Sequence, residues 1–130
     1  MEKQRMLLVE DHESTRRTLR RILTFQGWEI AEAGTVAEAL AILASEQCFD
    51  WVILDLMLPD GDGETVLKRV RDDALKTRVM VCTATYDPAR LDAVFDLGPD
   101  AVVQKPFNIM DVCRSLGSGA GRKQEDLASR

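Results

Sequence analysis

Residues 51–55 read WVILD, an unbroken apolar run that ends in an aspartate. Such a run is typical of a strand that is buried on both faces of a parallel sheet. Residues 6–11 read MLLVED, so a second apolar run also ends in carboxylates. If the two strands are parallel neighbours, Glu10, Asp11 and Asp55 meet at one edge of the sheet, because parallel strands end together. These two segments therefore predict the centre of a sheet with a cluster of acidic side chains beside it.

Outward from these segments, short apolar runs alternate with amphipathic helical patterns five times along the chain. Thr35 and Glu38 have the spacing of a capping box at a helix start, and Asp87 followed by Pro88 is typical of another start. The expected strands cover 6–9, 28–31, 51–54, 79–82 and 101–103, and the expected helices begin near 13, 36, 64, 88 and 109.

Five strand–helix alternations in 130 residues predict an α/β domain whose parallel sheet is covered by helices on both faces. Right-handed crossovers favour a doubly wound, flavodoxin-like (βα)5 arrangement with the strand order 2-1-3-4-5. This order makes the first and third strands neighbours, as the acidic cluster requires. In the fourth helix, Leu91, Val94 and Phe95 are expected to face the core.

The composition is that of an ordinary globular protein, with 45% hydrophobic and 30% charged residues. The net charge of −5 argues against a general nucleic-acid surface, which needs a clustered basic excess. We interpret the arginines between residues 16 and 21 as the solvated face of the first helix. No apolar run approaches the roughly 18 residues that span a bilayer, and no signal peptide is visible.

The three cysteines are widely spaced and form no CxxC pair, which argues against a disulfide framework or a zinc site. Cys82 and Cys113 lie in apolar patterns and are expected in the core. Free thiols of this kind predict a cytoplasmic location.

The predicted acidic cluster needs compensation, because crowded carboxylates disfavour one another's ionisation. A hard divalent cation with oxygen ligands would supply positive charge, and so would a lysine. Lys105 follows the fifth expected strand and precedes Pro106, which constrains the chain toward extended geometry. The combination predicts a site that holds a hard metal ion and handles a phosphoryl group.

Four sequence elements occur in order, each at the end of an expected strand. They are Val9-Glu10-Asp11, the stretch from Asp55 through Pro59 to Gly63, Thr83-Ala84 and Lys105-Pro106. With these elements, residues 1–117 resemble the receiver domain of a bacterial two-component response regulator. The resemblance implies a switch that accepts a phosphoryl group on Asp55 and so alters its interaction surface. Such a domain is not a conventional enzyme, although it assists its own phosphorylation and dephosphorylation.

For the metal, the resemblance implies Mg²⁺, with Mn²⁺ as an alternative. Its ligands would be the carboxylates of Asp11 and Asp55, with Glu10 contributing directly or through a water molecule. The backbone carbonyl of Met57 would complete the ligands from the protein.

For the phosphoryl group, the resemblance implies Asp55 as the acceptor and Lys105 as a positive charge beside a phosphoryl oxygen. The Thr83 hydroxyl and the Ala84 backbone N–H would receive the remaining oxygens. In this family the peptide bond between the lysine and the following proline is cis.

The implied donor is a sensor histidine kinase or a phosphotransfer protein, and the recipient is a downstream target or a covalently linked output domain. The family's signalling surface is made by the fourth helix, fifth strand and fifth helix. Here it would carry charges of both signs and could pair two copies in a homodimer; these charged residues are Arg90, Asp92, Asp96, Asp100 and Arg114. We expect no membrane contact and no direct nucleic-acid binding by this segment. Residues 118–130 are expected to be a flexible polar tail or a truncated linker to an output domain absent from this sequence.

Val102 departs from the family pattern. The fifth strand usually carries an aromatic residue that turns inward when the threonine shifts, and that position lies three residues before Lys105. Because a valine has little reach, we expect activation to rely on movement of the loop after Thr83 and of the fourth helix.

Other classes fit less well. A haloacid-dehalogenase-type phosphatase needs a second aspartate two residues after its nucleophile, where this chain has Met57. A calcium loop beginning at Asp60 would need a glutamate at the position of Arg71. His12 is interpreted as a solvated loop residue rather than a metal ligand or phosphohistidine. The alternative that stays open is a receiver-like interaction module that works without phosphorylation.

Overall fold

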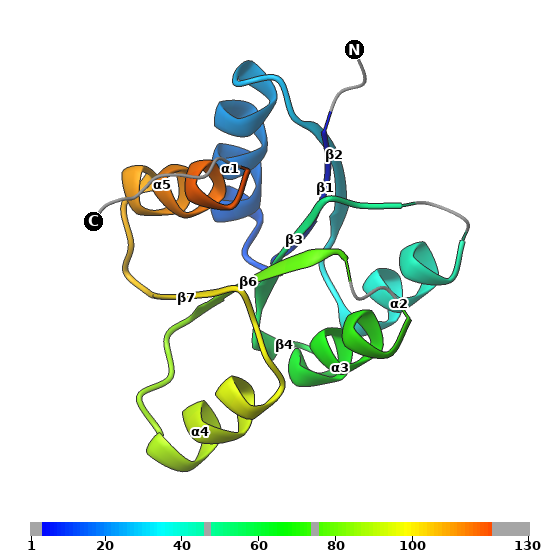
Figure 1. The fold of residues 1–130 in the computed structure, drawn as a ribbon, viewed down its shortest axis with the longest axis vertical. Coiled ribbons are helices and arrows are strands. Elements are labelled where there is room, and N and C mark those ends of the chain that lie inside the picture. The colour runs from blue at the N-terminus through cyan, green and yellow to red at the C-terminus, as the bar shows by residue number, and fades with distance from the viewer. Residues whose placement is uncertain (1–3, 46–47, 74–75, 121–130) are drawn as a thin grey trace.

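The computed structural model describes residues 4–45, 48–73 and 76–120. Its central sheet is parallel and has the strand order β2-β1-β3-β6-β7 (Figure 1). Since β6 and β7 are the fourth and fifth strands of this sheet, the predicted order 2-1-3-4-5 is confirmed. The strands are β1 (Arg5–Val9), β2 (Glu29–Ala33), β3 (Trp51–Asp55), β6 (Arg78–Thr83) and β7 (Ala101–Gln104).

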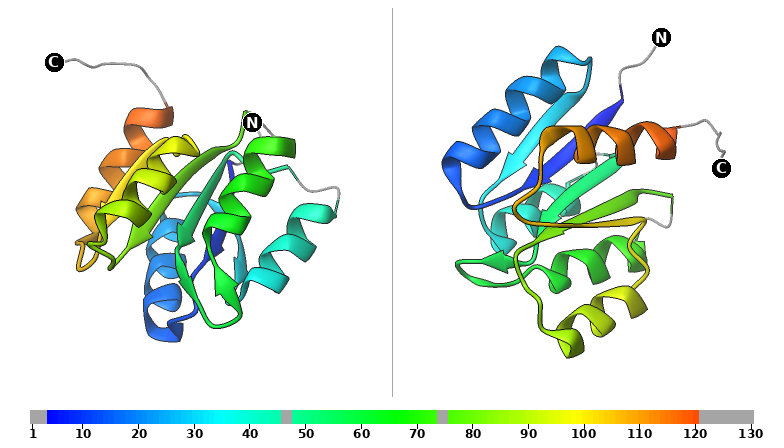
Figure 2. Two further views of the ribbon diagram at one scale, coloured as in Figure 1. Left: turned by 90° about the horizontal axis from the view of Figure 1, so that it is seen from below. Right: turned by 90° about the vertical axis from the view of Figure 1, so that its left-hand side faces the viewer.

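Helices cover both faces of the sheet, as the two further views show (Figure 2). On one face lie α1 (Glu13–Phe25) and α5 (Ile109–Ala120), and on the other lie α2 (Val36–Ala44), α3 (Glu64–Asp73) and α4 (Pro88–Asp96). Each face has its own apolar cluster, so β3 is buried over its whole length. Within the described residues, no helix has the length and apolar character needed to cross a membrane.

The register aligns the carboxyl ends of the strands. Val9 lies opposite Leu54, Asp55 lies opposite Cys82, and Thr83 lies opposite Gln104. The residues that directly follow β1, β3, β6 and β7 therefore come together at one edge of the sheet, as expected for parallel neighbours.

The start of α2 is held from two directions. The Thr35 hydroxyl accepts from the Glu38 N–H at 3.0 Å, which confirms the predicted cap. The Glu38 carboxylate reaches back to the N–H of Gly34 at 2.7 Å, one residue earlier than in a standard capping box. In addition, Asp60 accepts from the N–H groups of both Val36 and Ala37.

Helix α4 differs from the prediction in the face that it buries. Val94 is buried and Leu91 half-buried, but the side chain of Phe95 is 59% exposed. Leu97 packs against the core instead. The buried stripe thus runs through positions 91, 94 and 97, and the expectation for Phe95 was wrong.

Two further expectations are adjusted by the structure. Helix α5 continues to Ala120. Residues 118–120, which were expected in the tail, are therefore helical, and the rest of the expected tail, 121–130, lies outside the described residues.

Cys82 is buried as expected, and burial raises the pKa of its thiol to about 12. Cys113 is half-buried at the α1–α5 contact, where its thiol lies 3.5 Å from the Gln26 amide oxygen.

Candidate functional site: an acidic cluster with one lysine

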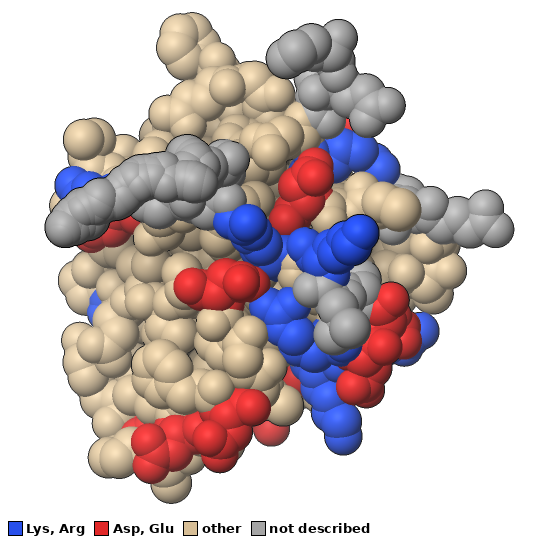
Figure 3. Space-filling view, in the orientation of Figure 1, with Lys and Arg blue, Asp and Glu red and all other residues tan. Residues whose placement is uncertain are grey.

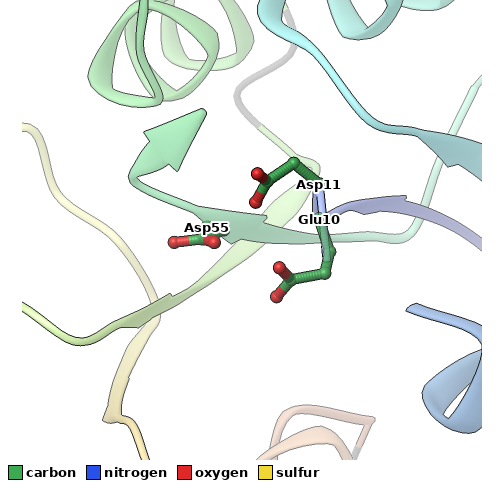
Figure 4. A group of neighbouring side chains, drawn as sticks. All are labelled: Glu10, Asp11 and Asp55. Atoms are coloured by element: carbon green, nitrogen blue, oxygen red, sulfur yellow. The ribbon is translucent and has the colours of Figure 1, made fainter. Parts of the chain in front are cut away.

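Three carboxylates meet at the carboxyl end of the sheet (Figure 4). Glu10 and Asp11 follow β1 and Asp55 ends β3, and one oxygen from each lies within 4.8 Å of the others. Glu10 and Asp55 are buried, while Asp11 is exposed. The predicted cluster is therefore present, and it combines two buried carboxylates with one that faces solvent.

Lys105 reaches the same cluster from the end of β7. Its ammonium lies 2.7 Å from Glu10 Oε1 and 3.1 Å from Asp55 Oδ2. Its backbone N–H donates to the Thr83 carbonyl at 2.8 Å, which ties the segment after β7 to the end of β6. The Lys105–Pro106 peptide bond is cis, as the resemblance implies.

The charges in the cluster influence one another. Burial raises the pKa of Glu10, and the charge of Asp55 adds to the increase, although the Lys105 ammonium and the His12 N–H oppose it. Burial acts to lower the pKa of Lys105, but its bonds and attraction to Glu10 and Asp55 outweigh burial and raise that pKa. Lys105 therefore stays an ammonium, and its single positive charge is shared between Glu10 and Asp55 in a cluster of three carboxyl groups.

The remaining predicted residues, Met57, Thr83 and Ala84, lie at or after the ends of β3 and β6, which are neighbouring strands. The Oδ1 of Asp55 accepts at 3.1 Å from the N–H of Met57, which lies two residues further along the chain and begins β4 (Met57–Leu58). Thr83 is fully buried at the end of β6, and its hydroxyl accepts from the N–H of Thr85 at 3.1 Å. Ala84 is exposed beside it.

A cavity of about 590 Å³ opens beside the cluster. It lies between the start of α1 and the segment after β7, and its lining includes His12, Thr15, Ala84, Lys105 and Phe107. His12 is exposed, as expected of a loop residue, and its N–H donates to Glu10 Oε2 at 3.0 Å. Among the charged residues of the cluster, Lys105 lines this cavity, whereas Glu10, Asp11 and Asp55 do not.

The family model of the response regulator receiver domain matches residues 6–116, which contain all of these site residues. The chain belongs to this family. Response regulator MprA of Mycobacterium bovis (strain BCG / Pasteur 1173P2) is 33% identical over 125 residues, which cover 95% of this chain and 54% of the relative. The chain thus spans about half the length of the curated relatives that it matches.

Solved receiver structures are similar to this receiver domain over most of its length. The non-phosphorylated HemR receiver domain from Leptospira biflexa has a TM-score of 0.84 at 29% identity, with 96% of this chain and 100% of that chain covered. A response regulator from Burkholderia pseudomallei has a TM-score of 0.80 at 25% identity, with 90% and 69% covered. That protein contains a phosphorylated aspartic acid, a calcium ion and citrate.

These similarities confirm the family that the sequence predicted and favour a receiver domain over a module that works without phosphorylation. Receiver domains bind a divalent metal at an acidic pocket, and the cluster of Glu10, Asp11 and Asp55 corresponds to that pocket. The donor set fits such an ion, because hard divalent cations prefer carboxylate oxygens and three carboxyl groups meet in the cluster.

Sequence reasoning missed a role for Arg90 at this site. Arg90, in the first turn of α4, makes two bonds to the Glu64 carboxylate, at 2.7 and 2.9 Å. It also donates to the Leu56 carbonyl, directly after Asp55, at 2.9 Å. The sequence holds only part of the signal: Glu64 and Arg90 have opposite charges at the starts of α3 and α4, but the packing of the two helices decides whether they meet.

Proposed function

We propose that this receiver domain accepts a phosphoryl group on Asp55 from a sensor histidine kinase or a phosphotransfer protein, in a Mg²⁺-dependent reaction. The observation that carries the proposal is the convergence of three carboxylates and Lys105 on one cluster, with Asp55 in contact with the lysine. The cavity between α1 and the segment after β7 is lined by Lys105, which contacts Asp55, and this supports approach of the donor from the α1 side.

The reaction is nucleophilic attack by an Asp55 carboxylate oxygen on phosphorus. A new oxygen–phosphorus bond forms as the bond from phosphorus to the donor's imidazole nitrogen breaks, and the product is an acyl phosphate. Because the carboxylate and the phosphoryl group repel each other, electrostatic stabilisation must supply most of the rate enhancement. Lys105 places a positive charge where the phosphoryl oxygens would lie.

The carboxylates of Asp11 and Asp55, with Glu10 and the Met57 carbonyl, would hold Mg²⁺. When bound, the ion would neutralise negative charge on the acceptor and the phosphoryl oxygens. Mn²⁺ has similar oxygen preferences and is the alternative ion.

Thr83 and Ala84 would receive phosphoryl oxygens after the transfer. The Thr83 hydroxyl would give up its bond with the Thr85 N–H and donate to the phosphoryl group. This change would release the loop that leads into α4, and with Val102 in place of an aromatic residue, we propose that loop and helix movement carries the signal.

Intact-mass analysis after incubation with acetyl phosphate and Mg²⁺ tests the acceptor. We expect a gain of one phosphoryl group that is lost in Asp55→Ala and with a chelator. The matched control is Asp96→Ala, which removes an exposed aspartate from α4 and should leave the gain intact. Phosphorylation that persists in Asp55→Ala would place the acceptor on another residue.

We further propose that the altered surface acts on a downstream target or a linked output domain, and that this segment works in the cytoplasm. Self-association through α4, β7 and α5 is a related proposal, although two charged residues of that surface have internal partners. Arg90 binds Glu64, and Asp100 binds Arg71. Sedimentation over a concentration series, with and without a phosphoryl mimic, would contradict a dimer if the chain stayed monomeric throughout.

A further inference from the structure

The peptide group between Leu56 and Met57 is hydrogen bonded on both sides. Its N–H, from Met57, donates to Asp55 Oδ1 at 3.1 Å. Its carbonyl oxygen, from Leu56, accepts from the Gly63 N–H and from Arg90 Nη2, each at 2.9 Å. One peptide unit therefore connects the Arg90 guanidinium to the carboxylate of the proposed phosphoryl acceptor.

Arg90 is itself firmly held. Its Nε and Nη2 bind the two oxygens of Glu64 at 2.7 and 2.9 Å, and both side chains are largely covered, with 24% and 21% exposed. Hydrogen bonding to Arg90 lowers the pKa of Glu64, and the same bond raises the pKa of Arg90, so the pair is ionised. Because the guanidinium is planar and two hydrogen bonds to Glu64 fix it, the position of its third hydrogen bond, to the Leu56 carbonyl, is fixed as well.

Close backbone packing holds the loop between Asp55 and α3 near the hydrogen bond from Arg90 to the Leu56 carbonyl. A Cβ atom at Gly63 would lie 2.4 Å from the Asp55 carbonyl oxygen, so the chain returns to β3 in close backbone contact. Arg90 reaches across this return from α4. The orientation of the Leu56–Met57 peptide therefore depends on the position of α4 as well as on the local turn.

We propose that Arg90 is a positioning residue for phosphoryl transfer. By binding the Leu56 carbonyl, it fixes the Met57 N–H that orients Asp55, and with it the backbone that presents the Met57 carbonyl to the metal. The inference rests on the proposed function, since it concerns the geometry of the same acceptor.

Three variants test the role of Arg90. Arg90→Met removes the donor but keeps an aliphatic chain, and Arg90→Lys keeps the charge but cannot serve Glu64 and Leu56 as a rigid fork. Arg69→Met is the control, because it removes an arginine of α3 whose partner is Asp73 on the same helix.

The first readout is the initial rate of phosphorylation by acetyl phosphate at fixed Mg²⁺, measured by intact mass. We expect Arg90→Met to react about tenfold more slowly than wild type, as for loss of a hydrogen bond from a charged group. Arg90→Lys should recover part of the rate, and Arg69→Met should stay within about twofold of wild type.

The second readout does not require phosphorylation. In a Mg²⁺ titration followed by the Met57 amide resonance, Arg90→Met should show weaker binding than wild type, and Arg69→Met should not. If Arg90→Met does not fold, Arg90→Lys and Glu64→Gln provide the same comparisons. A folded Arg90→Met with a lower thermal midpoint but wild-type rate and Mg²⁺ titration would overturn the inference and leave the proposed function standing. A wild-type chain that accepts no phosphoryl group would overturn both.

Discussion

Lys105 has two expected effects on the acidic cluster: it neutralises negative charge, and it would contact a phosphoryl oxygen. Its ammonium is shared between Glu10 and Asp55, so it neutralises part of a charge that would otherwise bind a metal ion more strongly. The same ammonium is placed to meet a phosphoryl oxygen. Removal of the ammonium should therefore raise the affinity of the cluster for a metal ion but lower the rate of phosphorylation.

For Lys105→Met we expect phosphorylation by acetyl phosphate to slow on the order of a hundredfold, comparable to the loss of a preorganised donor. Mg²⁺ affinity should rise at the same time, because the cluster loses a positive charge. Intact-mass time courses and a Mg²⁺ titration measure the two effects. Lys68→Met is the control, because Lys68 is an exposed lysine of α3, and it should change neither the rate nor the affinity. If Lys105→Met reacted at the wild-type rate, Lys105 would have only a structural role.

Glu64 predicts a pH dependence of stability. Its bonds to Arg90 lower its folded-state pKa below the ordinary value of 4.5. A depressed carboxyl pKa contributes stability that is present above pH 4.5 and is lost as the pH falls through the folded-state pKa. The difference in free energy of unfolding between wild type and Glu64→Gln should therefore be largest near neutral pH and shrink on acidification. Urea unfolding across a pH series measures it, and a difference that grew in acid would contradict the assignment.

At the scale of elements, the turn from β3 into α3 is anchored by two helices. Asp60 binds the first N–H groups of α2 at 2.7 and 2.9 Å, and these bonds lower its pKa. Glu64 binds Arg90 of α4. The short antiparallel pair of β4 and β5 (Gly61–Asp62) closes the turn between these anchors. Asp55, the proposed acceptor, is thus followed by a segment that hydrogen bonds hold on both sides.

Gly63→Ala should destabilise the fold by about 1–3 kcal/mol, because its Cβ would overlap the Asp55 carbonyl oxygen. Gly117→Ala is the matched control: it lies in α5, where the new Cβ would have no described atom within 4 Å, and should stabilise by roughly 0.5–1 kcal/mol. Urea denaturation of the two variants measures both changes. Equal stability of Gly63→Ala and wild type would mean that the turn can open.

The same elements show which features the sequence could predict. The strands and the clustering of Glu10, Asp11 and Asp55 were predictable, because an apolar run and the acid that follows it lie within one short window, as in 51–55. The inward face of α4 was not, because positions 91, 94 and 95 fit the helical period as well as 91, 94 and 97 do. The bond between Glu64 and Arg90 joins residues 26 positions apart on two helices, and helix packing decides whether they meet.

At the scale of the whole molecule, the two ends of the parallel strands carry different groups. The acidic cluster lies at the carboxyl ends of the strands. At their amino ends, Arg71 donates to the carbonyls of Gly98 and Thr77 and to the Asp100 carboxylate. Acidic side chains flank basic ones on the face that Figure 3 shows, so this face offers no uninterrupted basic surface.

Arg71→Met should lower the free energy of unfolding by about 1–3 kcal/mol, because it removes three hydrogen bonds, of which the one to the Thr77 carbonyl is partly buried. In the folded fraction, the rate of phosphorylation by acetyl phosphate should equal that of wild type, since Arg71 lies at the end of the strands away from Asp55. Urea unfolding and intact-mass time courses, both well below the unfolding midpoint, give the two values. A parallel loss of rate would show that the two ends are coupled.

The bond between the Lys105 N–H and the Thr83 carbonyl has a consequence for synthesis on the ribosome. The acidic residues at 10, 11 and 55 are made early, but the lysine that faces them arrives only when β7 has emerged and docked beside β6. A nascent chain that stops short of this strand lacks the ammonium that Glu10 and Asp55 share in the folded domain. The charged residues of the proposed phosphoryl chemistry are therefore complete only when the last strand of the sheet is in place.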